Sequence, residues 1–360
     1  MLVLRLAALA LALAAVSAPA QIQLVELEPT RDTTIYADAT GSLANGAGTG
    51  LFVGRTGQGR AARALLFFDV AAVVPAGMVI TRAELELQVS RTRASSMVIT
   101  MHRVDQSWGE GSSTAARGGG GGAPATTGDA TWIHRFFPGQ LWTTPGGDFA
   151  ATTTSTATAG AFGPVLWPTS AALVAEAQAM LDQPTTNFGW LLRGDENTSA
   201  LRLDSRESAA TLRPKLRLRY APRAELSSFG SGCSSSVGTP LVLGGFGPPR
   251  LGTIFQVQLQ GAPNGAASFL FYSVGLEPNP IAIGNGCSIL LDLASTQFFA
   301  GLGISPYGPA IVTGGFADHA VVLPFHPLLA GVRFEYQAFV LDPVPTTVRS
   351  SNVLRARLGL

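Results

Sequence analysis

Apolar and polar residues alternate with a period of two in several short segments of the chain. In residues 83–89, Ala, Leu, Leu and Val alternate with Glu, Glu and Gln. Residues 215–220 repeat the pattern with Lys and Arg on the polar side, and residues 255–260 and 332–338 alternate in the same way. Successive side chains of a strand point to opposite faces, so this period predicts strands with one buried face and one solvent-exposed face.

Other segments complete an all-β pattern. Residues 63–70 form an apolar run, which is typical of a central strand covered on both faces. Gly, Pro and Asn separate the segments, and together they predict antiparallel β-sandwiches. One short helix is expected: Thr169 or Ser170 can cap it, residues 171–181 carry its apolar stripe, and Pro184 follows its end.

Charge divides the chain into two parts. Residues 21–223 contain 18 basic and 17 acidic residues, whereas residues 224–360 contain only 5 basic and 6 acidic residues. A Ser- and Gly-rich run follows the boundary, as in a linker. We therefore predict two antiparallel β-sandwich modules in tandem, the first containing the helix. Two low-complexity runs in the first module, residues 118–122 and 150–160, are expected to be surface loops.

The amino-terminal residues 1–20 have the composition of an export signal. One Arg precedes an apolar run at residues 6–16, and small residues follow up to Ala20. This predicts a secretory signal peptide cleaved between Ala20 and Gln21, and hence a secreted, extracellular or cell-surface protein. The apolar run is too short to span a bilayer, and no later segment predicts a membrane span.

The chain has two cysteines, Cys233 and Cys287, both in the second module. Export makes a disulfide between them feasible, and it would close a loop of about 55 residues and contribute at most ~4 kcal/mol. Two buried free thiols are the alternative. A C-x-x-C redox pair and a four-cysteine zinc site are both absent from the sequence.

Composition excludes several classes of function. The net charge of +1 gives no electrostatic basis for binding nucleic acid. Lys215 is the only lysine and has no Gly-rich loop around it, so a P-loop is excluded. The sequence contains neither a Gly-x-Ser-x-Gly elbow nor a His-Glu-x-x-His motif, and its histidines match no common metal spacing. We therefore expect a protein that is not an enzyme.

Three oxygen-bearing side chains follow one another at Asp195, Glu196 and Asn197. They could contribute to a Ca²⁺ site, the only cofactor that the sequence suggests, because Ca²⁺ takes six to eight oxygen ligands. An ordinary acidic hairpin turn is the simpler interpretation of the same residues.

Tryptophans and arginines are the residues most suited to a flat, hydroxylated ligand. All five tryptophans lie in the first module. Trp132 and Trp142 stand in Gly- and Pro-rich context and are expected to be the exposed pair, with Arg193 and Arg206 as further candidate ligand-binding residues. The basic stripe at residues 213–219 either faces an anionic polymer or pairs with Glu84 and Glu86 across strands, and the sequence favours neither alternative.

The first module also resembles a known family. Residues 30–220 resemble the DNRLRE-type domain, also called carbohydrate-binding module family 96, of secreted bacterial and archaeal surface proteins. The segments that carry the resemblance occur in the family's order: residues 32–36, 45–48, 51–54, 63–70, 80–85, 104–111, 129–132, 145–149, 187–192, 205–207 and 213–216. The second module resembles Cys-containing β tail domains of secreted bacterial proteins.

The resemblance implies a β-sandwich of a binding-module type, in a family whose members are associated with polysaccharides such as alginate. It also suggests that Arg206 and Glu207 serve the fold as a buried pair. The leading hypothesis is a secreted, non-catalytic protein that binds an extracellular polysaccharide or a cell surface. The alternative is a structural protein of the cell surface or extracellular matrix with no soluble ligand.

Overall fold

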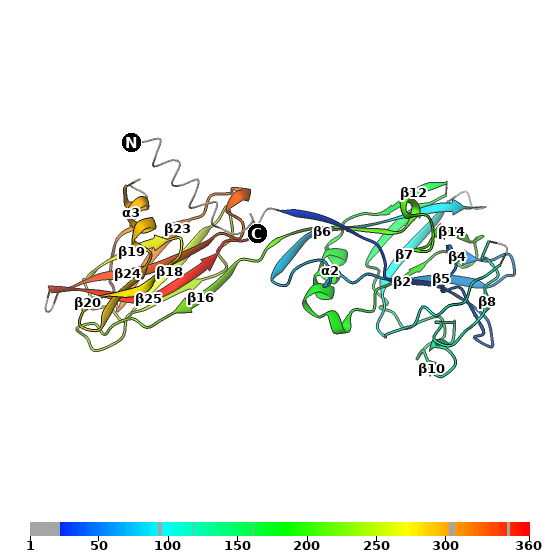
Figure 1. The fold of residues 1–360 in the computed structure, drawn as a ribbon, viewed down its shortest axis with the longest axis horizontal. Helices are drawn as coiled ribbons and strands as arrows, with labels where there is room; N and C mark the ends of the chain where they lie inside the picture. The colour runs from blue at the N-terminus through cyan, green and yellow to red at the C-terminus, as the bar shows by residue number, and fades with distance from the viewer. Residues whose placement is uncertain (1–21, 93–95, 117, 161, 302–306, 344–345) are drawn as a thin grey trace. The chain divides into compact units, whose positions relative to one another are not determined.

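The computed structural model describes residues 22–92, 96–116, 118–160, 162–301, 307–343 and 346–360 (Figure 1). The expected signal peptide at residues 1–20 lies outside them. The chain divides into two compact units, Leu24–Tyr220 and Ala221–Leu360. Each unit is described by itself. Among the described residues, no helix combines the length and the apolar character needed to cross a bilayer.

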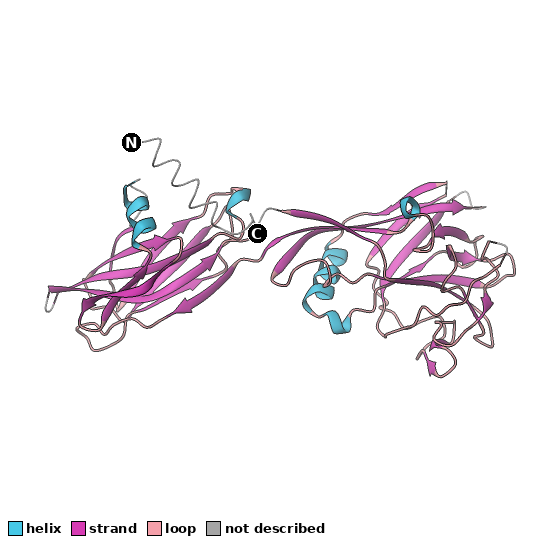
Figure 2. Ribbon diagram, in the orientation of Figure 1, coloured by secondary structure: helices cyan, strands magenta, loops and turns pink. Residues whose placement is uncertain are grey.

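Strands dominate both units and form several antiparallel sheets, so the predicted all-β fold class is confirmed (Figure 2). The first unit contains β1 (Gln23–Leu27), β2 (Arg31–Tyr36), β3 (Leu43–Ala44), β4 (Gly50–Arg55), β5 (Ala61–Phe67), β6 (Met78–Arg91), β7 (Met97–Arg103), β8 (Ala123–Pro124), β9 (His134–Phe136), β10 (Gln140–Leu141), β11 (Ser155–Ala159), β12 (Gly163–Trp167), α2 (Ala171–Asp182), β13 (Trp190–Arg193), β14 (Leu201–Asp204) and β15 (Lys215–Pro222). Short 3-10 turns occupy Pro184–Thr186 and Ala210–Leu212.

Two groups of strands enclose the core of the first unit. One runs β1-β15-β6-β14-β4, with β12 also paired to β6, and the other runs β5-β13-β7-β11, with β2 also paired to β5. Strand β4 joins the groups, because it pairs with β14 and, at Gly54 and Arg55, with β5. The predicted alternation is confirmed in β6, where Leu85 and Leu87 are fully buried in this core.

The opposite face of β5 is buried as well, in a second and smaller core. Leu65 of β5 packs there with Ile35 of β2 and Leu191 of β13. The segment between β7 and β11 covers these side chains with Trp108 and Trp142. Because both faces of β5 are covered, the prediction of a central strand in this region is confirmed.

The predicted helix is confirmed as α2. Ser170 caps it, since its side chain accepts a hydrogen bond from the backbone N–H of Leu173 at 3.0 Å. Its buried residues include Leu173, Ala177 and Met180, which pack into the main core of the unit. The helix lies along β6, where Gln178 accepts a hydrogen bond from the backbone N–H of Ile80.

The predicted surface loop at residues 150–160 is wrong over Ser155–Ala159, which form β11 and pair with β7. Ala157 and Ala159 are buried in the main core. Small side chains can fill a closely packed edge of a sandwich, so low sequence complexity does not exclude a strand. Gly119 in the other low-complexity run is also buried, and its carbonyl accepts a hydrogen bond from Tyr36 Oη at 2.8 Å.

The second unit is a sandwich with additional elements. Its strands and helix are β16 (Glu225–Phe229), β17 (Val242–Phe246), β18 (Ile254–Gln260), β19 (Ala267–Ser273), β20 (Leu276–Gly284), β21 (Cys287–Leu291), α3 (Leu293–Gly301), β22 (Tyr307–Ile311), β23 (Phe316–Val322), β24 (Arg333–Pro343) and β25 (Thr346–Arg357), with a 3-10 turn at Pro327–Leu329. One sheet runs β16-β25-β24-β19-β22 and the other runs β17-β18-β23. The core between them includes Phe255, Leu270 and Tyr336.

The sequence predicts a single helix, but the second unit contains another, α3. Asp292 precedes it, and Asp292 Oδ2 accepts a hydrogen bond from the backbone N–H of Ser295 at 2.9 Å. An Asp in that position is an N-terminal cap signal that the sequence does contain. The run that follows lacks a clear apolar stripe, which explains why the helix is missed.

The predicted disulfide is confirmed: Cys233 and Cys287 are joined, with their Cα atoms 4.9 Å apart. The bridge ties the segment that precedes β17 to the first residue of β21. Strand β21 pairs its backbone with β20 and packs against β24 and β25 of the larger sheet. The bridge therefore helps to hold the β20–β21 hairpin against that sheet.

Candidate functional site

Arg63 organises a polar site that contains two of the four predicted ligand-binding residues, Trp132 and Arg193. It projects from β5 and is buried, with its Nε 2.6 Å from Glu196 Oε1. Its Nη1 donates a hydrogen bond to the Gly146 carbonyl at 2.8 Å, and its guanidinium lies 4.5 Å from the ring centroid of Trp132. Arg63 thus holds an acidic turn, a glycine loop and an aromatic side chain in one arrangement.

Gly146 is required for this arrangement. Its φ is +95°, and a Cβ there would lie 2.5 Å from Arg63 Nη1 and 2.9 Å from the Trp132 ring. Its backbone N–H also donates to the Trp132 carbonyl at 2.6 Å. Glycine alone combines this backbone conformation with so close an approach.

Glu196 connects Arg63 to Arg193. Besides its contact with Arg63, Glu196 Oε1 lies 3.2 Å from Arg193 Nε at the end of β13. Burial raises the pKa of Glu196, but the hydrogen bond and charge of Arg63, together with the charge of Arg193, outweigh it and hold that pKa below its usual value. The carboxylate is therefore ionised and shared by two guanidinium groups.

The structure favours the ordinary turn over a Ca²⁺ site at Asp195, Glu196 and Asn197. Asp195 accepts hydrogen bonds from the backbone N–H of Asn197 at 3.0 Å and from Thr198 Oγ1 at 2.6 Å. Glu196 turns instead toward the two arginines. The adjacent acidic residues thus have different partners, as expected for a capped turn.

The prediction that Trp142 is exposed is wrong. It is 4% exposed, and its Nε1 donates a hydrogen bond to the Thr131 carbonyl at 2.9 Å. It packs in the smaller core with Ile35 and Leu191. Its Gly- and Pro-rich context belongs to a segment that folds back over the sheet and so buries its large aromatic side chains. Trp132, by contrast, is only partly buried.

Arg206 lies among carboxylates. Its Nη1 is 3.2 Å from Glu110 Oε2 and 3.0 Å from Glu207 Oε1, and its side chain is 37% exposed. The expected pairing with Glu207 is present, although the pair is only half-buried. Neither Glu110 nor Arg63 is predicted from the sequence as a site residue. Both lie within segments that carry the family resemblance, and this is the only feature of the sequence that points to them.

The basic stripe on β15 pairs across strands. Lys215 and Arg217 lie 2.8 and 2.9 Å from Glu26 of β1, and Arg217 is also 2.9 Å from Glu86 of β6. Arg213 pairs with Glu28 at 2.9 Å. These residues are therefore largely compensated, by Glu26 of β1 and Glu28 just after it as well as by the predicted Glu86.

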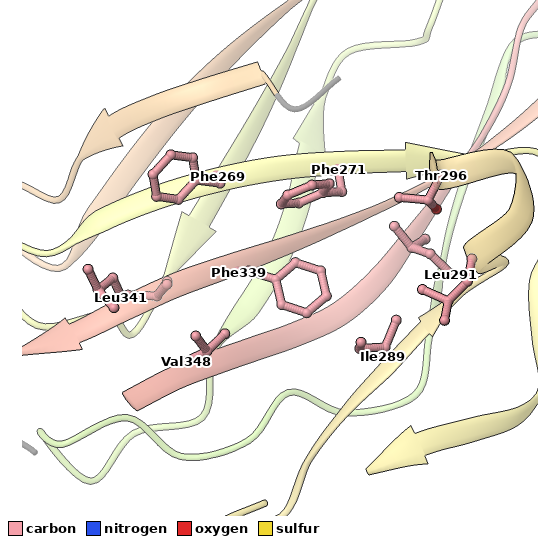
Figure 3. Close-up of a pocket in the computed structure, with 10 residues that line it drawn as sticks. Phe269, Phe271, Ile289, Leu291, Thr296, Phe339, Leu341 and Val348 are labelled. Atoms are coloured by element: carbon pink, nitrogen blue, oxygen red, sulfur yellow. The ribbon is translucent and has the colours of Figure 1, made fainter. Parts of the chain in front are cut away.

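An apolar cavity lies in the second unit, over the outer face of the larger sheet. It has a volume of about 550 Å³, and Figure 3 shows Phe269, Phe271 and Phe339 on strands of the sheet with Ile289 and Leu291 from β21 facing them. Thr296 is the one polar side chain among the described residues that line it. The cavity therefore offers little to the hydroxyl groups of a sugar.

A comparison with models of known protein families finds no match for this chain, and a search of curated proteins finds no relative.

Proposed function

We propose that the unit Leu24–Tyr220 is a non-catalytic polysaccharide-binding module of an exported protein. The observation that carries the proposal is the arrangement around Arg63. It holds the partly buried Trp132 and, through Glu196, the 44% exposed Arg193 in a fixed relation. The resemblance to carbohydrate-binding module family 96 supports the same function.

The chemistry of these side chains suits a sugar. An indole presents an apolar surface to a sugar ring, and a guanidinium presents a planar set of donors to hydroxyl or carboxylate oxygens. Arg63 and Glu196 fix the two groups before a ligand arrives, which reduces the entropy that binding costs. The near-neutral charge of the chain favours recognition by such local contacts over long-range attraction to a polyanion.

The disulfide between Cys233 and Cys287 supports export, because disulfides persist mainly in oxidising compartments outside the cytosol. The predicted signal peptide points the same way. An extracellular polysaccharide, in solution or on a cell surface, is then a ligand that this protein can meet.

Affinity electrophoresis of the whole mature chain through gels containing alginate, pectin, chitin or cellulose tests the proposal. At least one polymer should retard the protein, and Arg193→Ala and Trp132→Ala should weaken that retardation. Arg82→Ala is the matched control, because Arg82 is also about half exposed and pairs with a neighbouring Glu, but on β6. The absence of retardation on all four polymers, or an equal loss in the control, would contradict the proposal.

One feature of the second unit favours the structural alternative. Its smaller sheet leaves large apolar side chains exposed, among them Phe246 of β17, Ile254 of β18 and Val322 of β23. Exposed apolar surface of this kind is typical of contact with other macromolecules. A matrix or surface role requires that the protein be recovered with the cell envelope or as an assembly, so recovery only as a free monomer in the medium would reject it.

A further inference from the structure

Three carboxylates from distant parts of the first unit converge beside Arg206. Asp32 lies in β2, Glu110 follows β7, and Glu207 lies in the turn after β14. One carboxylate oxygen of each residue lies within 4.8 Å of the others. Glu110 Oε1 also accepts a hydrogen bond from the backbone N–H of Asp32 at 2.8 Å, which ties the segments that carry these two groups together.

Asp32 is incompletely satisfied in this cluster. The residue is fully buried, and its Oδ2 accepts a hydrogen bond from the backbone N–H of Arg206 at 2.8 Å. Its Oδ1 is buried and has no hydrogen-bond partner. An enclosed carboxylate oxygen without a partner is costly, so a native protein normally supplies it with a donor, a proton or a cation.

The charges around Asp32 do not compensate it. Arg206 bonds to Glu110 and Glu207 through Nη1, whereas Arg31 donates to the Trp108 carbonyl at 2.7 Å and stacks on Phe67. The cluster is thus short of positive charge where Asp32 is enclosed.

We propose that Asp32, Glu110 and Glu207 bind a divalent cation, and that this cation is Ca²⁺. Ca²⁺ accepts irregular sets of oxygen ligands, with carbonyls and water completing six to eight positions. Mg²⁺ demands near-ideal octahedral geometry, keeps several waters and is usually bound through one or two carboxylates. Three carboxylates from separate segments of the chain therefore suit Ca²⁺ better.

The position of the site gives it a structural role. The three carboxylates come from one strand and two loops that are far apart in sequence. A cation shared among them links β2 to the segment that covers the smaller core and to the turn before β15. The Arg206 side chain is 37% exposed, so a cation that replaces it on Glu110 and Glu207 leaves its guanidinium beside water.

Calorimetric titration of the EDTA-treated mature chain with CaCl₂ tests the inference. We expect one Ca²⁺ per chain, with a Kd near the 10⁻⁴–10⁻³ M that is typical of extracellular calcium modules, and weaker binding of MgCl₂. Glu207→Gln and Asp32→Asn each remove one ligand charge and should weaken Ca²⁺ binding about tenfold or more. Circular dichroism establishes that each variant is folded.

Asp195→Asn is the matched control, because it changes the acidic turn that the sequence suggested as a Ca²⁺ site and should leave Ca²⁺ binding unchanged. The wild-type titration alone can overturn the inference: if the protein binds no Ca²⁺, the cluster is neutralised by protons instead. Loss of binding in Asp195→Asn but not in Glu207→Gln overturns it as well. No polysaccharide is used, so this result is independent of the proposed polysaccharide binding.

Discussion

The residue pair Arg63 and Glu196 shows how a local motif acquires its role from the fold. In sequence, Glu196 is one of three consecutive oxygen-bearing residues. In the structure, a buried arginine 133 residues earlier in the chain takes its carboxylate. Because Arg63 is buried, removal of its carboxylate partner should cost more than the loss of a surface ion pair does.

The Glu196→Gln variant measures that cost. The pKa of Glu196 is lowered from 4.5, so its charge stabilises the fold above about pH 4.5, and this stabilisation is lost as the pH falls through the lower folded-state pKa. We expect the substitution to reduce the free energy of unfolding by about 1–2 kcal/mol near neutral pH, between the values for exposed and buried pairs. Urea unfolding from pH 3 to pH 7 should show the difference shrink toward the acidic end.

Glu28→Gln is the control for this measurement. Glu28 pairs with Arg213 at 2.9 Å, but the two side chains are 43% and 36% exposed. A pair of that kind contributes about 0–1 kcal/mol. If both variants lose the same free energy of unfolding, Glu196 contributes no more than an ordinary surface carboxylate. The inference that Arg63 organises the site would then be wrong.

At the scale of elements, period-two alternation predicts strands well where one face of the strand meets water. It is correct for β6 and β18, whose polar faces are at least partly exposed. The same alternation predicts the strand β24 correctly but not its exposed face, because Glu335 and Gln337 are expected to face solvent and are buried. Strand β21, which is distant in sequence, covers that face of the sheet. The alternation within one segment cannot predict such a contact.

The candidate site was predictable in part for the same reason. Arg193 is exposed at the end of β13, and Trp132 is partly exposed in the loop before β9. Trp142 is buried by residues far away in the sequence. The carboxylate cluster also depends on long-range convergence, since 78 residues separate Asp32 from Glu110. Sequence spacing alone cannot indicate such a site.

Gln337 of β24 is one of the side chains that join β21 to the larger sheet. Its Oε1 accepts from the backbone N–H of Leu290 at 3.0 Å, and its Nε2 donates to the Ser288 and Ser351 carbonyls at 2.9 and 2.8 Å. We expect Gln337→Ala to raise the hydrogen-exchange rate of the Leu290 amide about 10–100-fold, because a lost buried hydrogen bond costs about 1–3 kcal/mol.

Gln256→Ala is the matched change on an exposed position of β18 and should leave that amide unaffected. The disulfide at Cys287 remains in both variants and keeps β21 tethered at one end. Hydrogen exchange read by NMR or mass spectrometry resolves the two outcomes. Unchanged exchange at Leu290 in Gln337→Ala would show that the apolar contacts of β21 hold it in place without the glutamine.

At the scale of the whole molecule, the two units have different means of stabilisation. Each encloses its own hydrophobic core. The disulfide lies within Ala221–Leu360, whereas the carboxylate cluster lies within Leu24–Tyr220. A reductant should therefore act on one unit and Ca²⁺ on the other, provided that the units unfold separately.

The distribution of tryptophan makes this prediction measurable in the intact chain. All five tryptophans lie between residues 108 and 190, so tryptophan fluorescence reports the unfolding of the first unit alone. The disulfide spans 54 residues, and its loss should cost about 4 kcal/mol, which corresponds to a fall of about 10 °C in the Tm of the second unit. Calorimetry should show that fall on reduction while the fluorescence midpoint stays constant.

CaCl₂ should have the opposite effect, raising the fluorescence midpoint and leaving the disulfide-dependent transition where it is, because a ligand stabilises only the folded unit that binds it. The double variant Cys233→Ser/Cys287→Ser provides the control, since reductant should no longer move either transition. If reduction lowers the fluorescence midpoint as much as the calorimetric one, the two units unfold as one cooperative structure. The contacts within each unit would then not be sufficient for the two units to unfold independently.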